Sequence, residues 1–268
     1  MPKPTLMSFL MGKPIIHKTI RVLRLQDIAV KILAFRPVKR RLKRSGCEYR
    51  VRFLESLLAA DEIFAREIYR EAFEGRDIRT FIDVGANVGF FTLYAADFTG
   101  LRDLVGVSVD ANSTMTDEVQ WHVDHNGLTR TRVITGVAGY PSDIKTATFF
   151  VNASNLASSP RPALNPRVPS KGSSVRRTVP TVDVAAEWKA FAGDSRVDLL
   201  KIDVEGFECD LIRNSPELCS LADRIVMEWH KWVTSLDEVH GLLRAHGFVR
   251  RRVLGEDEHA GIALFDRE

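Results

Sequence analysis

Hydrophobic runs of strand length alternate with stretches of helical spacing through most of the chain. The runs at 80–84, 104–109 and 132–135 are short and rich in β-branched residues, and helical stretches at 90–98 and 116–126 separate them. Later runs at 197–204 and 224–229 are also followed by helical stretches. A strand, a helix and a further strand in this order form a parallel unit, so the pattern predicts an α/β fold with a mostly parallel sheet.

Two regions depart from this rhythm. The runs at 146–151 and 176–182 predict an inserted β-hairpin around a Pro- and Ser-rich loop at about 152–175, and the chain ends in two strands at 248–254 and 261–265. Long loops inside compact domains are often lids, and a basic lid suits a substrate with negative charge or many hydroxyls. A solvated basic loop is the alternative. The basic residues in question are Arg161, Arg167, Lys171, Arg176 and Arg177.

Amphipathic spacing between Tyr49 and Glu74 predicts one or two helices that precede the sheet and cover its ligand edge. Tyr69 lies either over a ligand there or in the core. We therefore divide the chain into a basic leader with an N-terminal helical cap, 1–74, and a main domain, 75–268, which includes the loop insertion.

Composition allows one sizeable core, because 45% of the 268 residues are hydrophobic. Residues 1–44 hold twelve Lys or Arg against the single acid Asp27. This leader either packs on the domain with a polar outer face or makes a peripheral membrane contact. No aromatic residues are interleaved with its charges, so we expect no nucleic-acid partner.

Cysteine spacing and hydropathy point to a soluble cytoplasmic protein. Cys47, Cys209 and Cys219 form no C-x-x-C pair and are expected to be buried reduced thiols. No apolar run reaches the length of a membrane span or of a signal-peptide core.

The segment Phe81 to Phe91, FIDVGANVGFF, predicts a buried strand that enters a glycine-rich turn and then a helix. Gly85 and Gly89 leave room for a ligand against the backbone, and the helix start presents N–H groups there. Asp83 would repel a pyrophosphate, and the third glycine of the dinucleotide fingerprint is missing. The turn therefore favours S-adenosylmethionine, whose sulfonium and ammonium suit a carboxylate, over NAD. An ordinary βα turn is the alternative.

Polar residues also follow the other predicted strands, at the edge where parallel sheets bind ligands. Asp110 ends the second strand, where a carboxylate can accept both ribose hydroxyls of an adenosine or cap a helix. In DLLKIDVEGFE, strand alternation places Lys201, Asp203 and Glu205 on one face. Buried charges persist when they are paired or serve a site, so we expect a functional cluster here, with a structural salt-bridge network as the alternative.

The segment MEWH, which ends at His230, places Glu228 and His230 on one face of the next strand. His230 titrates near neutrality and is either a proton acceptor or a core residue. With Asp203 and Glu205 these residues offer metal ligands, but the tight spacing of metalloenzymes is missing, so we expect no metal.

With FIDVGANVGFFTLYAA early, and LLKIDVEGFE and IVMEWH late, the chain resembles the FkbM-type S-adenosylmethionine-dependent methyltransferases from about Tyr49 to Phe265. The resemblance implies a Rossmann-like class I methyltransferase fold, whose seven-stranded, mostly parallel sheet has an antiparallel last strand. The family commonly has Glu-Pro where this chain has Asp110 and Ala111. The expected cofactor contacts are Asp83, Gly85, Asn87, Gly89, Phe90, Asp110, Ala138 and Asp203.

Membership would imply O-methylation of a hydroxyl on a sugar, glycan or secondary metabolite. We expect His230, oriented by Glu228, to be the base, Asp203 and Glu205 to position the acceptor or the cofactor ammonium, and Lys201 to balance their charge. Two alternatives stay open. One is a nicotinamide-dependent oxidoreductase on a Rossmann-like sheet, and the other is a non-catalytic member that binds cofactor or carbohydrate.

Overall fold

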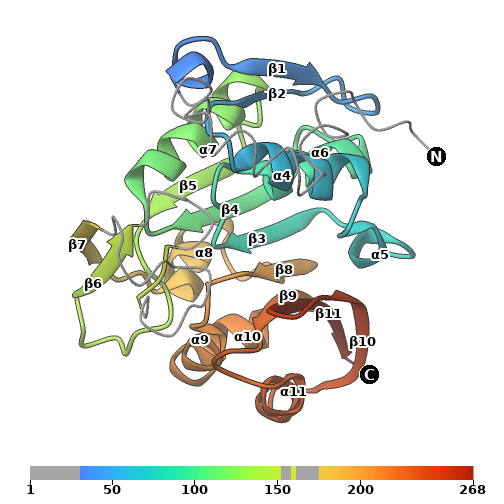
Figure 1. The fold of residues 1–268 in the computed structure, drawn as a ribbon. Helices are drawn as coiled ribbons and strands as arrows, with labels where there is room; N and C mark the ends of the chain where they lie inside the picture. Colours follow the sequence, from blue (N-terminus) through green and yellow to red (C-terminus); the bar gives the residue numbers. More distant parts are fainter. Residues whose placement is uncertain (1–30, 152–157, 161–174, 268) are drawn as a thin grey trace.

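A seven-stranded sheet forms the centre of the computed structural model, which describes residues 31–151, 158–160 and 175–267. The strand order is β10, β11, β9, β8, β3, β4, β5 (Figure 1). Strands β3, β4, β5, β8 and β9 are parallel, and β11 is antiparallel to both of its neighbours. This arrangement confirms the predicted fold. The strand bounds are β3 (Thr80–Val84), β4 (Val105–Asp110), β5 (Thr131–Thr135), β8 (Leu199–Ile202), β9 (Arg224–His230), β10 (Phe248–Glu256) and β11 (Ala260–Arg267).

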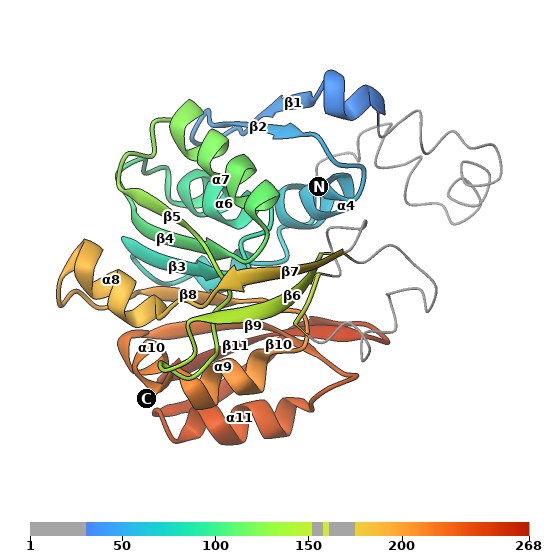
Figure 2. The same cartoon turned by 90° about the vertical axis from the view of Figure 1, so that its left-hand side faces the viewer.

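Helices cover both faces of the sheet, in two hydrophobic layers (Figure 2). Trp188, which is fully buried, belongs to the layer of α8 (Val184–Ala192), α9 (Glu208–Asn214), α10 (Pro216–Leu221) and α11 (Leu236–Arg244). Phe91 belongs to the opposite layer, with α5 (Arg70–Phe73), α6 (Phe90–Thr99) and α7 (Ser113–His125). The alternating strands and helices predicted from the sequence therefore place the core on both sides of the sheet.

The segment before the sheet is only partly helical. Strands β1 (Val38–Arg41) and β2 (Glu48–Val51) form an antiparallel hairpin, followed by α4 (Ser56–Ala60), the π-helix η1 (Asp61–Ala65) and α5. The prediction of helix from position 49 is wrong for β2, because Arg50 of this strand is held by α7. Its guanidinium donates to Glu118 at 2.8 Å, and its backbone N–H donates to His122 Nε2 at 3.0 Å.

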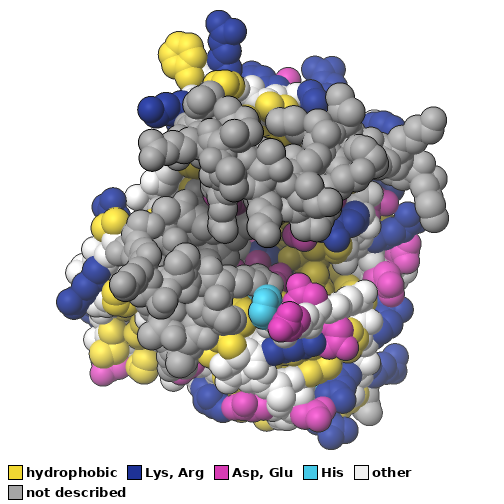
Figure 3. All heavy atoms as spheres, in the orientation of Figure 1, with side chains coloured by type: hydrophobic (Ala, Val, Ile, Leu, Met, Phe, Trp, Pro, Cys, Tyr) yellow, Lys and Arg dark blue, Asp and Glu magenta, His cyan; other side chains and the backbone are white. Residues whose placement is uncertain are grey.

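The basic leader falls mainly on residues 1–30, which lie outside the described residues. Its membrane contact and the domain division at residue 74 stay predictions. On the face drawn in Figure 3, basic and acidic side chains intermingle over the described surface. No helix within the described ranges is long and apolar enough to cross a bilayer. The three cysteines are buried and free, as expected.

The predicted inserted hairpin is confirmed: β6 (Thr146–Val151) pairs antiparallel with β7 (Val175–Pro180). Phe149 of β6 packs with Ala111 and Val137, which follow strands β4 and β5. Ser159 pairs with β6 through its backbone, and its hydroxyl donates to the Glu205 carbonyl at 2.7 Å. The hairpin thus reaches the carboxyl edge of the sheet. Arg161, Arg167 and Lys171 lie outside the described residues, so the lid stays a prediction.

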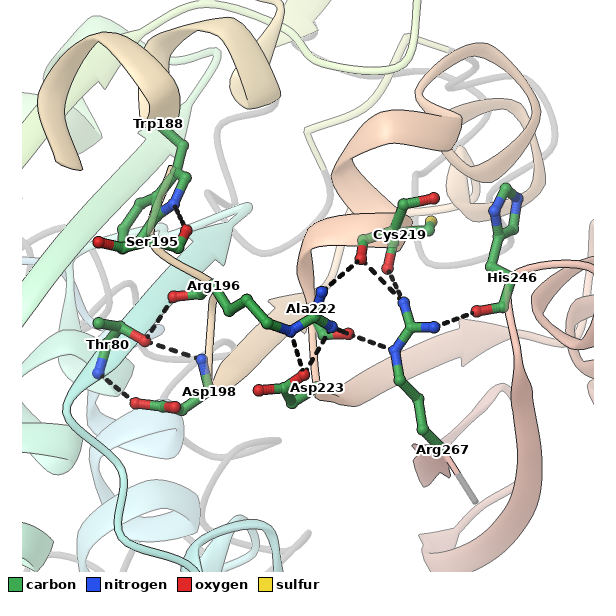
Figure 4. A network of polar contacts seen from close by, with 11 residues as sticks. Thr80, Trp188, Ser195, Arg196, Asp198, Cys219, Ala222, Asp223, His246 and Arg267 are labelled. Carbon is green, nitrogen blue, oxygen red and sulfur yellow. Dashed lines mark hydrogen bonds and ion pairs between the residues drawn. The ribbon is translucent and has the colours of Figure 1, made fainter. Parts of the chain in front are cut away.

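Polar contacts brace the opposite edge of the sheet (Figure 4). The Asp198 carboxylate accepts the Thr80 N–H at 2.8 Å and so ties β8 to β3. The Arg267 guanidinium donates to the carbonyls of Ala222 at 2.8 Å and Cys219 at 3.1 Å. This edge is stabilised by the chain's own groups, whereas the carboxyl edge holds a crevice.

Candidate active site

A crevice opens at the carboxyl ends of β3, β4 and β8. Six of its lining residues are among those expected at the site from the sequence: Gly85, Asn87, Asp110, Ala138, Asp203 and Glu205. The inserted hairpin adds Phe149, Ser158 and Pro160 to the lining. Parallel strands present their polar ends at this edge of an open sheet, which is where such folds bind ligands.

The glycines of the first turn are required by the protein's own backbone. Gly85 has φ 78°, and a Cβ at this position would overlap the carbonyl oxygen of Asp203. Gly89 has φ 82° at the start of α6, and a Cβ there would lie 3.1 Å from Val119. Glycine reaches this backbone conformation without steric cost. The turn therefore packs closely against β8 and α7 on one side, and only part of it faces the crevice.

Asp83 lies beneath the turn. Its side chain is fully buried, and Lys201 Nζ lies 3.1 Å from Asp83 Oδ1. The Thr92 hydroxyl donates to Asp83 Oδ2 at 3.2 Å. Lys201 in turn donates to the Gly85 carbonyl at 2.6 Å and lies 3.6 Å from Asp203. Neither Asp83 nor Lys201 lines the crevice, so this pair acts on the site by holding the turn.

The charge of Lys201 is fixed by its neighbours. Burial alone would lower the pKa of Lys201, but the carboxylates of Asp83 and Asp203 raise it above its ordinary value. The sequence predicted that Lys201 balances Asp203 and Glu205, whereas in the structure the two acids beside its ammonium are Asp83 and Asp203.

Asp110 lines the crevice. Its two carboxylate oxygens accept the backbone N–H groups of Asn87 and Asn112, each at 2.8 Å. Burial raises the pKa of Asp110 to about 6, against the effect of these two hydrogen bonds. Each oxygen keeps a lone pair for a further donor, so the carboxylate is suited to a ribose.

The polar segment after β8 is a turn. The strand ends at Ile202, and Glu205 and Gly206 have φ values of 49° and 90°. The prediction that Lys201, Asp203 and Glu205 share a face by strand alternation is therefore wrong, since alternation stops before Asp203. The turn nevertheless brings Asp203 and Glu205 to the crevice.

His230 is held by Glu208. Its ring is fully buried, and its Nδ1 lies 2.7 Å from Glu208 Oε1. Its Nε2 lies 3.5 Å from a Glu205 oxygen and 3.7 Å from a Glu228 oxygen. The expectation that Glu228 orients the ring is wrong, because the short hydrogen bond belongs to Glu208. Burial alone would lower the pKa of His230, but Glu208, Glu205 and Glu228 raise it to about 10.

Glu208 was missed by the sequence reasoning. It is fully buried at the start of α9 and also accepts the Gly206 N–H at 2.9 Å. The available signal was an acid three residues after Glu205, directly beyond a glycine turn. A carboxylate at a helix start can turn back to accept backbone N–H groups.

Two aromatic candidates belong to the core. Phe90 packs between the rings of Tyr49 and Phe64, at centroid distances of 5.5 and 5.3 Å, and does not line the crevice. Tyr69 packs edge-on against Phe91 at 5.2 Å. The charges of the site nevertheless affect its hydroxyl. Burial, followed by the charges of Asp203 and Glu228, raises the pKa of Tyr69 well above its ordinary value.

Comparison with known families gives one match, to the family model described as Methyltransferase FkbM domain, over residues 83–250. A search of the curated proteins finds no match. The matched region includes the glycine turn, Asp110, the turn after β8 and His230. It therefore spans every polar element of the crevice.

Solved structures similar to this chain are distant in sequence. The N-terminal domain of EvdMO1 with SAH bound has 13% identity and a TM-score of 0.44, with 78% of this chain and 81% of that chain covered. The precorrin-6y C5,15-methyltransferase from Geobacter metallireducens GS-15 has 8% identity and a TM-score of 0.45, covering 76% and 87%. The ribosomal protein L11 methylase from Lactobacillus delbrueckii subsp. bulgaricus has 12% identity and a TM-score of 0.45, covering 75% and 76%.

Proposed function

Since the chain belongs to the FkbM methyltransferase family, we propose that it transfers the methyl group of S-adenosylmethionine to a hydroxyl of a sugar, glycan or secondary metabolite. S-adenosylmethionine is the cofactor of this family. Membership removes the nicotinamide oxidoreductase from consideration. The O-methyl acceptor and the roles of individual residues are the proposed part.

The residues of the crevice fit the cofactor. Asp110 suits the ribose hydroxyls. Gly85 and Ala138 also line the crevice, and these small residues leave room for the cofactor. Asn87 Oδ1 and Asp203 Oδ1 are buried without a hydrogen-bond partner among the described residues, and both residues line the crevice. A buried acceptor without a donor is costly, so these two oxygens are suited to the donors of the methionine part.

The observation that carries the hydroxyl acceptor is the acidic cluster beside the crevice: Asp203, Glu205, Glu228 and His230. When bound, S-adenosylmethionine supplies a methyl group whose C–S bond breaks with its electron pair leaving on sulfur, as the acceptor oxygen forms the new bond to carbon. The acceptor hydroxyl must lose its proton, and the carboxylates of this cluster are groups that can accept it.

We place proton removal on the carboxylates of the cluster. With a pKa raised to about 10, His230 carries its proton at neutral pH while the cluster is unliganded, and its Nε2 then faces oxygens of Glu205 and Glu228 at 3.5 and 3.7 Å. Orientation of the acceptor by these groups contributes as much as basicity, since a methyl sulfonium is already activated. Glu208 takes the orienting role expected of Glu228.

The experiment is incubation with methyl-labelled S-adenosylmethionine and a panel of hydroxylated sugars, glycans and metabolites. We expect label on an acceptor oxygen, recognised as a methyl ether by carbon NMR. His230→Ala should lower turnover by about 100-fold and leave cofactor affinity unchanged. The control His246→Ala, at the opposite edge of the sheet (Figure 4), should change neither turnover nor cofactor affinity. Cofactor binding without transfer to any member of the panel would favour the non-catalytic alternative. Label on nitrogen or carbon would refute O-methylation.

A further inference from the structure

Two large apolar side chains are exposed at the start of the described chain. Residues 31–35 are helical and precede β1. Leu33 is buried and packs with Leu54, which fixes this segment on the domain. Ile32 and Phe35 are instead 56% and 84% exposed. Residues three apart in a helix share a face, so these two side chains form an apolar outer face of the segment.

The same part of the chain is strongly basic. Residues 31–44 contain seven Lys or Arg and no acid. The seven residues, all of them exposed, are Lys31, Arg36, Lys39, Arg40, Arg41, Lys43 and Arg44. Within the described ranges only two of them form ion pairs, Lys39 with Glu48 at 3.2 Å and Arg44 with Glu67 at 3.3 Å. The other five charges are not neutralised by the protein, so the local potential is positive.

Strand β10 has a similar composition, but its charges are largely paired. Val253 is 44% exposed and follows three arginines. Arg251 pairs with Asp237, and Arg252 pairs with Glu71 at 3.0 Å. A single exposed apolar side chain is common on a protein surface. The segment before β1 differs because two apolar side chains share a face beside unpaired cations. In Figure 3, hydrophobic and basic side chains project together from the region that holds β1 and the preceding helix in Figure 1.

We propose that an apolar-basic patch, made of Lys31, Ile32, Phe35 and Arg36, docks on the surface of an anionic phospholipid bilayer. Apolar side chains beside clustered cations are typical of segments that bind such membranes. The apolar side chains enter between the headgroups, and the cations are attracted by the charge of the lipids. No helix of the described residues is long and apolar enough to cross a bilayer, so the proposed contact is peripheral.

Nucleic acid fits this patch less well, although it is also a polyanion. Proteins that hold single strands stack successive bases on several aromatic rings. Phe35 is the one aromatic residue of 31–44, and the side chain that shares its face, Ile32, is aliphatic. An aliphatic side chain gains most from an apolar environment, which lipid chains provide.

The test is flotation of the full-length protein with vesicles of phosphatidylcholine, prepared with and without phosphatidylglycerol. We expect binding to the anionic vesicles that added NaCl weakens, and little binding to phosphatidylcholine alone. Phe35→Ser should weaken binding about tenfold, because its ring no longer enters the bilayer. Lys31→Glu combined with Arg36→Glu should weaken binding at least about tenfold, because two attractive charges become repulsive.

Matched control variants change the same residue types elsewhere on the surface. Val253→Ser removes an exposed apolar side chain, and Lys189→Glu combined with Arg130→Glu reverses two exposed charges. Both controls should bind anionic vesicles as the wild type does. Folding of each variant is checked by thermal unfolding, and the comparison of the two vesicle types with the wild type stands even if a variant fails to fold.

Several results would overturn the docking surface. They are a wild type that binds neither vesicle type, equal binding to both, binding to RNA without binding to vesicles, and a dimer that Phe35→Ser dissociates in light scattering. The patch does not line the crevice, so Phe35→Ser should leave the affinity for S-adenosylmethionine unchanged in calorimetry. Absence of cofactor binding by the wild type would refute the proposed function and leave the vesicle result standing.

Discussion

Replacing Lys201 with Met tests whether the buried ion pair holds the cofactor turn. The side chains of Lys201 and Asp83 are 5% and 0% exposed, and Nζ also donates to the Gly85 carbonyl at 2.6 Å. Removing one partner of a buried pair leaves an uncompensated charge and costs about 3–5 kcal/mol. We therefore expect Lys201→Met to lower the free energy of unfolding by that amount, measured by urea denaturation.

A double-mutant cycle separates the pair from its surroundings. Asp83→Asn combined with Lys201→Met should be more stable than the sum of the single losses, by at least about 1.5 kcal/mol. The control is Lys189→Met, because this lysine is 50% exposed and 3.9 Å from Glu217, and such pairs contribute little. Losses that add within about 0.5 kcal/mol, or a Lys201→Met loss as small as the control's, would refute the reasoning.

Three further changes probe the site. Gly85→Ala should abolish cofactor binding in calorimetry and destabilise the fold, because its Cβ would overlap the Asp203 carbonyl; wild-type affinity would show that the turn yields. If Asp110 binds the ribose, the cofactor affinity of the wild type should fall as the pH drops through about 6, because only the ionised carboxylate offers both oxygens to the ribose. Asp110→Asn should bind the cofactor weakly at all pH values. A wild-type affinity that does not depend on pH would contradict this role. Glu208→Gln should lower the free energy of unfolding by about 2 kcal/mol, the worth of a charged hydrogen bond, in urea denaturation; an unchanged midpoint would show that His230 is held by other groups.

Periodicity predicted the sheet because parallel strands buried on both faces are short apolar runs, and this signal is local. The run at 80–84 and the helix at 90–98 were both predicted to within one residue of their bounds. The hairpin of β1 and β2 was missed because Arg50 depends on Glu118, far along the chain. No local pattern carries such a contact.

The sequence predicted which polar residues lie at the candidate site better than it predicted which of them are in contact. Strand ends gave Asp110, Asp203, Glu205 and His230, because polar side chains beside apolar runs are conspicuous. Which acid touches the histidine depends on a left-handed turn after β8, and spacing alone pointed to the wrong partner. Asp83 illustrates the same limit, since its carboxylate lies at the right turn but faces a lysine of the neighbouring strand.

The most direct test of the account is a crystal structure of the protein with S-adenosylhomocysteine. We expect the ribose on Asp110, the amino-acid part beside Asn87 and Asp203, and the sulfur directed at the cluster of Glu205, Glu228 and His230. Density for the compound at another edge of the sheet, or with its sulfur turned away from that cluster, would contradict the account.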